Sequence, residues 1–286
     1  MSKKKNILIT GATGQLGQEF LNLLPLEDFK VKGFSSKELD VTNAHALEVM
    51  FQNENPDILI NCAAYTAVDK AEVEVERCNQ VNAQALKVIG NLALEYKVNV
   101  LHFSTDYVFG GSGNQPWAEE NETAPISIYG ATKREGELAL LESECRCLIL
   151  RVSWLYSEFG SNFPKTINRL LSERENLNVV FDQVSSPTWS RPLVEFVIHN
   201  LHCNADFFNN KIYHYSEEGQ GSWYDMAEII NETHQKELTA VSSHEFIQAA
   251  KRPAYSKLDN TLAKSELGLA PDEWQYNLRK FLKIIQ

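Results

Sequence analysis

Three glycines at the end of a short apolar run constrain the fold of this chain more than any other feature of its sequence. The pattern Gly11-Ala-Thr-Gly14-Gln-Leu-Gly17 follows the apolar run of residues 7–10 and opens an amphipathic helical pattern. This order of strand, glycine turn and helix is the context in which such a pattern binds a dinucleotide. Gly11 would permit the tight turn, Gly14 would let the backbone approach a pyrophosphate, and Gly17 would let the helix pack close to the strand. An ordinary strand-to-helix turn is the alternative, and three glycines in register favour the dinucleotide interpretation.

Short apolar runs alternate with helical patterns over the first half of the chain. Each run is bounded by Gly, Pro, Asn or Ser and is mostly apolar on both faces, as buried parallel strands are. The predicted strands are Asn6–Thr10, Phe29–Phe34, Ile58–Asn61, Val98–Phe103 and Cys147–Val152. The alternation predicts an α/β fold, with a Rossmann-type, doubly wound parallel sheet that binds NAD(P) over residues 1–155.

After residue 155 the pattern changes to helices with fewer strands. The predicted helices are Asn162–Ser172, Pro192–Leu201, Ser222–Thr233, His244–Ala250 and Glu273–Ile285. We expect residues 156–286 to form a smaller, mostly helical substrate-binding part that covers the carboxyl edge of the sheet, with some exchange of chain between the two parts. Because no Pro-, Gly- or Ser-rich linker separates the halves, we expect a cleft within one compact body.

The charge of the chain limits its partners. Among 286 residues, 38 Asp and Glu outnumber 27 Lys and Arg, which gives a formal charge of -11. This balance argues against a broad surface for nucleic acid or anionic membranes, so an anionic ligand must meet a local cluster of donors. No segment approaches the roughly 18 consecutive apolar residues of a membrane span. Five cysteines, an odd number without CxxC spacing, favour free thiols in a reducing cytoplasm.

The residues after the second predicted strand bear on the choice of cofactor. In many dinucleotide folds an Asp or Glu at this position binds the ribose 2′-hydroxyl. Here the position reads Ser35-Ser36-Lys37, whose hydroxyls and ammonium suit a 2′-phosphate through charge-assisted hydrogen bonds. We therefore predict a preference for NADPH. NADH stays an alternative cofactor, because a different path of the loop would bring Glu38 to the ribose.

A tyrosine and a lysine lie four residues apart at the start of a further predicted helix. Ser127 is the predicted N-cap, and Tyr129 and Lys133 fall on one helix face. We expect the ammonium to favour the phenolate and to lower the pKa of Tyr129 towards a useful range for proton transfer. An ordinary solvated helix face is the alternative for such a pair alone. The hydroxyl of Thr105 follows the fourth predicted strand, where α/β sheets bind ligands, and this favours a catalytic interpretation.

Five further motifs extend over nearly the whole chain. They are Asn61-Cys-Ala-Ala-Tyr-Thr-Ala-Val-Asp69-Lys-Ala-Glu72, Ser104-Thr-Asp-Tyr-Val-Phe109, Arg151-Val-Ser-Trp-Leu-Tyr156, Asp182-Gln-Val-Ser-Ser-Pro-Thr188 and Arg252-Pro-Ala-Tyr-Ser-Lys-Leu-Asp259. With the glycine turn and the Tyr129–Lys133 pair, they resemble the dTDP-4-dehydrorhamnose reductase family, in the extended branch of the short-chain dehydrogenase/reductase superfamily. The resemblance implies an NADPH-dependent oxidoreductase that reduces the C4 ketone of dTDP-4-dehydro-β-L-rhamnose to dTDP-L-rhamnose, the last step in making that nucleotide sugar.

The resemblance also assigns the reacting groups and the cofactor ligands. Tyr129 would donate the proton, Lys133 would be its partner and a cofactor ligand, and Thr105 would hydrogen-bond the reacting oxygen. Together with the glycine turn and the residues after the second strand, the predicted cofactor ligands are Gly11, Gly14, Gln15, Leu16, Gly17, Ser35, Ser36, Lys37, Asp40, Val41, Ala63, Ala64, Tyr65, Thr66, Tyr129 and Lys133.

The substrate ligands that the resemblance implies are Thr105, Asp106, Trp154 and Arg252. Trp154 would form an apolar wall for the sugar ring, and a core tryptophan is its alternative. Arg252 would bind the substrate diphosphate, and a surface salt bridge is its alternative. Ser185 stands where the family usually has glycine, which affects the expected path of that loop but removes no catalytic group.

Several alternatives remain at this point. The sequence is also compatible with a reductase of another nucleotide 6-deoxy-4-keto sugar, or with a non-catalytic regulatory subunit like the partner of methionine adenosyltransferase. Tyr107 stands where dehydratases of the superfamily have glutamate after the aspartate, which disfavours that reaction. Some family members bind magnesium at a dimer interface through glutamates, but no matching set is evident here and we assign no metal. A homodimer is the default expectation for the oligomeric state.

Overall fold

A six-stranded parallel sheet forms the centre of the computed structural model, which describes residues 4–246 and 248–285. The strands are β1 (Lys5–Thr10), β2 (Phe29–Phe34), β3 (Ile58–Asn61), β4 (Asn99–Thr105), β5 (Cys147–Val152) and β10 (Lys211–Tyr215). Their order is β2-β1-β3-β4-β5-β10, so the direction of winding reverses between β1 and β3. Open α/β sheets bind ligands at the carboxyl ends of strands beside such a switch point.

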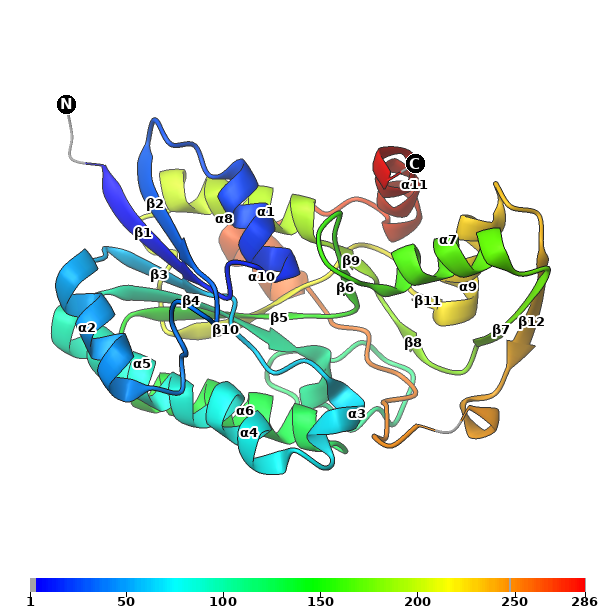
Figure 1. Cartoon of the computed structure of the whole chain (residues 1–286), viewed down its shortest axis with the longest axis horizontal. Coiled ribbons are helices and arrows are strands. Elements are labelled where there is room, and N and C mark those ends of the chain that lie inside the picture. Colours follow the sequence, from blue (N-terminus) through cyan, green and yellow to red (C-terminus); the bar gives the residue numbers. More distant parts are fainter. Residues whose placement is uncertain (1–3, 247, 286) are drawn as a thin grey trace.

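Helices cover both faces of this sheet (Figure 1). On one face lie α1 (Gln15–Leu23), α8 (Ser190–Cys203) and α10 (Thr261–Leu267), and on the other lie α2 (Ala44–Glu54), α5 (Ala85–Tyr96) and α6 (Ile128–Glu142). Successive strand residues point to opposite faces, so Ile7 and Ile9 pack in the first apolar layer and Leu8 packs in the second. This arrangement confirms the predicted doubly wound α/β fold.

A second lobe, on the right of Figure 1, is built around three helices and three short strand pairs. The helices are α7 (Phe163–Glu173), α9 (Trp223–Asn231) and α11 (Trp274–Ile285). The strand pairs are β6 (Leu155–Tyr156) with β9 (Thr188–Trp189), β7 (Asn176–Val180) with β12 (Glu237–Val241), and β8 (Val184–Ser185) with β11 (Gly221–Ser222). A separate apolar core that includes Leu171, Trp274 and Phe281 holds this lobe together.

The second half of the chain also contributes to the sheet, because α8, β10 and α10 return to it. The sequence predicts the other five strands but not β10. Among the described residues this strand pairs only with β5, and its polar residues Lys211 and His214 hide the apolar pattern of a buried strand.

The helix predicted over His244–Ala250 is wrong. The structure has one 3-10 turn at Ser243–Glu245, and position 247 lies outside the described residues. A capping box between Ser242 and Glu245 closes this single turn. The Asp182 carboxylate accepts hydrogen bonds from both Ser242 and Ser243, so the segment is fixed to the loop after β7 rather than continued as a helix.

Two short helices and a π-helix connect β3 to α5. They are α3 (Val68–Ala71), α4 (Val75–Asn79) and the π-helix Gln80–Gln84.

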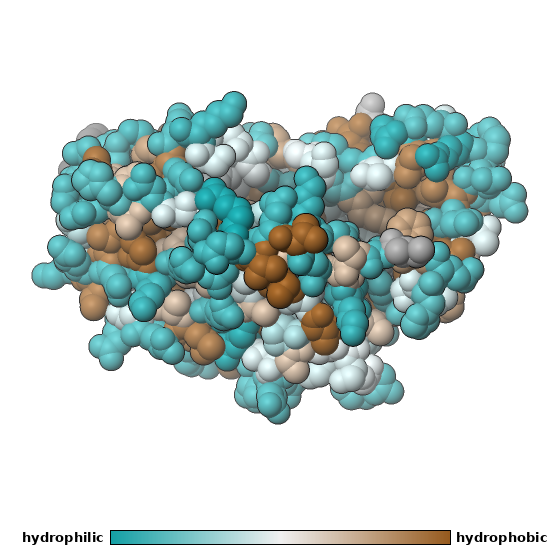
Figure 2. All heavy atoms as spheres, turned by 60° about the horizontal axis from the view of Figure 1, so that its bottom comes forward, coloured by the Kyte–Doolittle hydropathy of each residue, from teal (hydrophilic) through white to brown (hydrophobic). Residues whose placement is uncertain are grey.

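Figure 2 turns the lower side of Figure 1 forward and shows a mostly hydrophilic surface, with apolar atoms in small groups. No helix among the described residues is long and apolar enough to span a membrane.

Candidate active site

The glycine turn after β1 has the geometry that its predicted role requires. Gly11 has a φ of +65°, and a Cβ there would lie 2.7 Å from the backbone of Cys62 and Ala63. A Cβ on Gly17 would overlap the Gly11 carbonyl. Gly14 is the N-cap of α1, and no side chain among the described residues caps this helix. The first amides of α1 are therefore available to an anionic ligand at the positive end of the helix dipole.

Three adjoining cavities run from this turn into the second lobe. The loop cavity, of about 330 Å³, and the central cavity, of about 460 Å³, share Gly14, Ala63 and Ala64 as lining residues. The outer cavity, of about 640 Å³, shares Trp223 with the central cavity. Together they form an extended cleft over the carboxyl edge of the sheet.

The central cavity brings together all three residues predicted to carry the chemistry. Thr105 ends β4, and Tyr129 and Lys133 come from the first turns of α6. Asp106 and Trp154 line the same cavity. Of the predicted cofactor ligands, Gly14, Gln15, Leu16, Ala63, Ala64 and Thr66 also line it.

The start of α6 places Tyr129 and Lys133. The predicted N-cap is confirmed, because the Ser127 hydroxyl accepts a hydrogen bond from the Gly130 amide at 3.2 Å. The expected lowering of the tyrosine pKa is wrong: burial raises the pKa of Tyr129 to about 12, and the Thr105 hydroxyl only partly offsets it. The Lys133 ammonium is directed elsewhere, because Nζ donates to the Phe103 carbonyl at 2.6 Å. Tyr129 is therefore a protonated phenol at neutral pH.

Asp106 is a buried carboxyl group at the floor of the central cavity. The Ser256 hydroxyl donates to its Oδ2 at 2.5 Å, and the Thr105 hydroxyl donates to its Oδ1 at 3.1 Å. Burial raises the pKa of Asp106 to about 7, against the lowering by these hydrogen bonds. Asp106 thus joins the end of β4 to a segment of the C-terminal half.

The loop cavity holds some of the residues predicted to select the cofactor, but not all. Gly11, Ser36, Asp40, Val41 and Tyr65 line it. Ser35, Lys37 and Gly17 line none of the three cavities. The amide and hydroxyl of Ser35 both donate to the Glu38 carboxylate, at 2.8 and 2.7 Å, so Glu38 folds back onto its own loop.

Arg77 is a cation of the loop cavity that the sequence reasoning missed. It comes from α4 and donates to Thr42 Oγ1 at 3.0 Å and to Asp40 Oδ2 at 3.3 Å. In the sequence, Arg77 is marked only by its positive charge, which comes directly after the glutamates of residues 72–76. Two short helices and a π-helix decide where that charge falls, and helical periodicity does not predict them.

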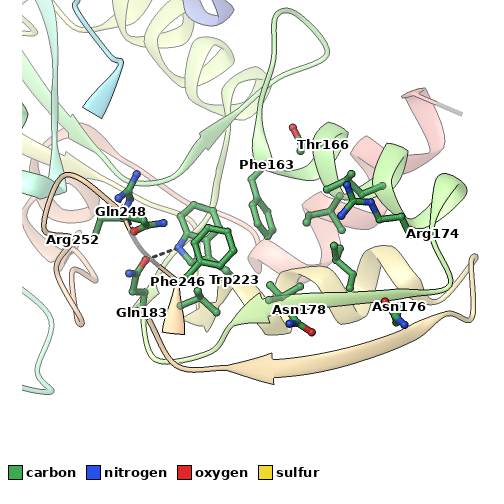
Figure 3. Close-up of a pocket in the computed structure, with 15 residues that line it drawn as sticks. Phe163, Thr166, Arg174, Asn176, Asn178, Gln183, Trp223, Phe246, Gln248 and Arg252 are labelled. Atoms are coloured by element: carbon green, nitrogen blue, oxygen red, sulfur yellow. Dashed lines mark hydrogen bonds between the residues drawn. The ribbon is translucent and has the colours of Figure 1, made fainter. Parts of the chain in front are cut away.

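The outer cavity lies between α7, α9 and β7 and is lined by apolar, uncharged polar and cationic side chains. Figure 3 shows Phe163 and Trp223 facing into it, with Arg252 and Arg174 at opposite ends. No carboxylate lines it among the described residues, although the protein is strongly acidic. Arg252 also forms a two-pronged ion pair with Asp69, at 3.2 and 2.7 Å.

Arg252 is therefore both part of a salt bridge and part of a cavity wall. The sequence reasoning did not identify Arg174 or Trp223. Trp223 begins a helix behind a Ser222–Asp225 capping box, a signal that marks the helix but not the cavity.

Comparison with known proteins gives a family for this architecture. The sequence matches the family model described as RmlD substrate binding domain over residues 5–286. It is 36% identical to the dTDP-4-dehydrorhamnose reductase of Escherichia coli (strain K12), and the match covers 97% of each chain. It is 35% identical to a probable dTDP-4,6-dihydroxy-2-methyloxan-3-one 4-ketoreductase of Streptomyces antibioticus, over 96% of this chain and 93% of that protein.

The fold agrees with that of solved relatives. The crystal structure of dTDP-4-dehydrorhamnose reductase from Bacillus anthracis in complex with NADP superimposes with a TM-score of 0.94 at 35% identity. The match covers 99% of this chain and 100% of that one. From the sequence match over almost its full length, and from the agreement of the two folds, the chain belongs to the dTDP-4-dehydrorhamnose reductase family.

Proposed function

We propose that the protein uses NADPH to reduce the C4 ketone of dTDP-4-dehydro-β-L-rhamnose to dTDP-L-rhamnose. The observation that carries this proposal is the meeting of Thr105, Tyr129 and Lys133 in a cavity that lies between two others. The loop cavity and the central cavity suit a dinucleotide, and the outer cavity suits the nucleotide of the substrate. The reacting groups would meet where the two ligands adjoin.

The residues present fit a dinucleotide cofactor. The turn at Gly11 has no room for a side chain, and the uncapped start of α1 offers amides to a pyrophosphate. Asp40 and Val41 line the loop cavity and would contact the adenine, and Ala64 and Thr66 line the central cavity and would contact the nicotinamide. The bound cofactor would supply the hydride.

The residues of the chain supply the proton and the electrostatic stabilisation. Tyr129, protonated at neutral pH, donates its phenolic proton to the developing alkoxide at C4. The Thr105 hydroxyl, which donates to Asp106 in the structure, would turn to donate to the same oxygen, and the positive charge of Lys133 adds a favourable field. Lys133 is fully buried, so this charge acts in a medium that screens it weakly. Water then restores the phenol.

The outer cavity supports an anionic, nucleotide-bearing substrate. Arg174 and Arg252 provide cationic groups without a lining carboxylate, and a planar guanidinium suits phosphate oxygens. Phe163 and Trp223, whose ring centroids lie 4.5 Å apart, provide one aromatic wall against which a base would pack. Arg252 would then exchange part of its contact with Asp69 for the substrate diphosphate.

A second candidate is the reduction of a different dTDP-linked 4-keto sugar. The name of the Streptomyces relative favours it, since that relative has nearly the same identity and coverage as the Escherichia coli enzyme. Oxidation of NADPH against a panel of nucleotide 4-keto sugars would decide. We expect the highest kcat/KM with the rhamnose precursor. No turnover with any sugar, together with stoichiometric capture of a protein partner, would contradict an enzymatic role.

Three further parts of the proposal concern the setting of the reaction. We assign cofactor binding to residues 1–155 and substrate binding to residues 156–286, apart from α8, β10 and α10, which return to the sheet. We assign the reaction to the cytoplasm, in support of which all five cysteines are free thiols. We expect no nucleic-acid partner and a homodimer, which light scattering would test.

A further inference from the structure

A row of three buried polar side chains crosses the sheet and ends at Lys133. Thr10, Asn61 and His102 occupy matching register positions on the neighbouring strands β1, β3 and β4, and each is 1% exposed. Thr10 Oγ1 donates to Asn61 Oδ1 at 2.5 Å, and Asn61 Nδ2 lies 3.0 Å from His102 Nδ1. His102 Nε2 lies 3.3 Å from Lys133 Nζ. We call Thr10, Asn61 and His102 the polar row.

The polar row lies in apolar surroundings, where each of its polar groups needs a hydrogen-bond partner. Ile60 and Leu101, next to its members on β3 and β4, are fully buried in the apolar core. A buried polar group destabilises the fold unless it is hydrogen-bonded. The imidazole of His102 meets this condition at both nitrogens only because Lys133 lies at the end of the row. The row and the lysine therefore form one hydrogen-bonded unit.

While His102 is neutral, its single ring proton can be on either nitrogen, so the hydrogen bonds of this unit can be arranged in two ways. If Lys133 is an ammonium, it donates to Nε2, the ring proton is on Nδ1, and the Asn61 carboxamide must turn its oxygen to that proton. If Lys133 is a neutral amine, its lone pair can also accept, so the ring proton can move to Nε2, and Asn61 then donates to Nδ1 while it accepts from Thr10. The second arrangement has the Asn61 orientation seen in the structure.

We propose that His102 is a positioning residue for the reaction: it holds Lys133 Nζ in place and couples the proton count of Lys133 to its own tautomer through the polar row. The inference rests on the proposed role of Lys133 beside Tyr129. It explains why a histidine is buried in β4 beside the reacting groups without lining the central cavity.

The surroundings of Lys133 support this assignment. Burial lowers the pKa of Lys133 to about 8, although Glu137 on its own helix, Cys78 on α4 and Cys62 after β3 favour the charged form. Burial, with Lys133 beside it, holds the pKa of His102 well below its usual range, so the imidazole is neutral at physiological pH. His102 can therefore respond to Lys133 by changing tautomer without taking up a proton from solvent.

Two substitutions at His102 should shift the pH dependence of kcat in opposite directions. Because the reaction draws on the ammonium of Lys133, kcat should fall as the pH rises through the pKa of Lys133. In His102→Gln the side-chain carbonyl can accept from the ammonium, so this alkaline limb should move up by about 0.5 to 1 pH unit. In His102→Leu the ammonium keeps the Phe103 carbonyl but loses its acceptor at position 102, so the limb should move down by a similar amount. A loss of packing alone would give no such opposite shifts.

His214 provides a matched control. It is also a buried strand histidine beside a cation, with Nε2 3.3 Å from Arg151, and it lines none of the three cavities. We expect His214→Gln to leave the alkaline limb unchanged. Shifts of the two His102 variants in the same direction, no shift in either, or an equal shift in His214→Gln would overturn the proposal.

Nitrogen NMR of the unsubstituted protein labelled with ¹⁵N-histidine tests the same idea without turnover. The signals of His102, assigned by their loss in His102→Gln, should show a proton on Nδ1 below the pKa of Lys133 and on Nε2 above it. One tautomer throughout about two pH units on either side of that value would refute the coupling. Because no sugar is present, this result is independent of whether the protein reduces the proposed substrate.

Discussion

The indole rings of Trp154 and Trp223 stack face to face, with their centroids 3.5 Å apart and their planes 7° apart. Trp154 follows β5 with a left-handed φ of 45°, and Trp223 begins α9 in the second lobe. Both rings line the central cavity, and Trp223 also lines the outer cavity. Its Nε1 donates to Gln183 Oε1 at 3.0 Å, which fixes the ring in its plane. The stack thus lies where the central cavity adjoins the outer cavity.

Replacing Trp223 by alanine should weaken substrate binding and leave the cofactor unaffected. Loss of the stack and of the cavity wall should raise KM for the nucleotide sugar about tenfold, the cost of one aromatic pair. The dissociation constant of NADPH should stay within about twofold, since Trp223 does not line the loop cavity and lines the central cavity only from the second lobe. Trp117→Phe is the control, because Trp117 stacks on Phe109 away from the three cavities. A change in NADPH affinity as large as the change in KM would contradict this assignment.

Tyr129→Phe should abolish proton donation by this residue and leave NADPH binding unchanged. The variant keeps the ring but loses the phenolic proton, so kcat should fall by about 10² to 10⁴. NADPH should still quench the protein fluorescence with an unchanged dissociation constant. A Tyr107→Phe variant is the matched control, because Tyr107 packs edge-on against Tyr129 at 5.7 Å and lines the same cavity. If Tyr107→Phe lowers kcat as far as Tyr129→Phe does, Tyr107 is the proton donor instead.

Local sequence signals predicted the parts of this site that depend on backbone alone. The glycine turn, five strands and the Ser127 cap follow from residue types whose backbone preferences are strong. The direction of the Lys133 ammonium does not, because spacing along a helix places two side chains on one face without fixing their rotamers. Local sequence signals do not predict the polar row either, because its members come together only through the register of three strands.

Charged residues were the hardest to place from the sequence. Lys37 lies three residues after the end of β2, yet Arg77, 40 positions later in the chain, lines the loop cavity instead. Glu38 turns back to Ser35, which no pattern of charges along the chain indicates. Long side chains reach several ångströms from their backbone, so only the packing of the surrounding elements decides where their charges lie.

Arg77→Ala should therefore weaken cofactor binding more than Lys37→Ala does. The Arg77 guanidinium is held by Asp40 and Thr42 at the part of the cavity assigned to adenine. A contact there should cost about threefold to thirtyfold in affinity, the range for a cation beside an aromatic ring. Titration of each variant with NADPH and with NADH distinguishes a contact with the adenine ring from a contact with the 2′-phosphate. Equal losses for both cofactors place Arg77 at the adenine, whereas a loss with NADPH alone would place it at the 2′-phosphate.

Glu217 should make the protein less stable as the pH rises towards 8. Its Oε1 accepts a hydrogen bond from the Trp189 amide at 3.0 Å, and the Asn277 side chain lies beside the carboxyl. Burial raises the pKa of Glu217 to about 8 from an ordinary value of 4.5. Between these two values the unfolded chain ionises while the folded protein keeps the proton. The free energy of unfolding should therefore fall with pH in this window.

Glu217→Gln should remove that slope, because glutamine keeps an acceptor for the Trp189 amide but does not ionise. Between pH 5 and 8, urea unfolding should show wild type losing stability relative to the variant by at most about 1.4 kcal/mol per pH unit. Below pH 4.5 the two curves should run parallel, since the carboxyl is then protonated in both states. The exposed Glu76→Gln variant should parallel wild type throughout. A Glu217→Gln curve parallel to wild type above pH 5 would mean that Glu217 is ionised in the folded protein.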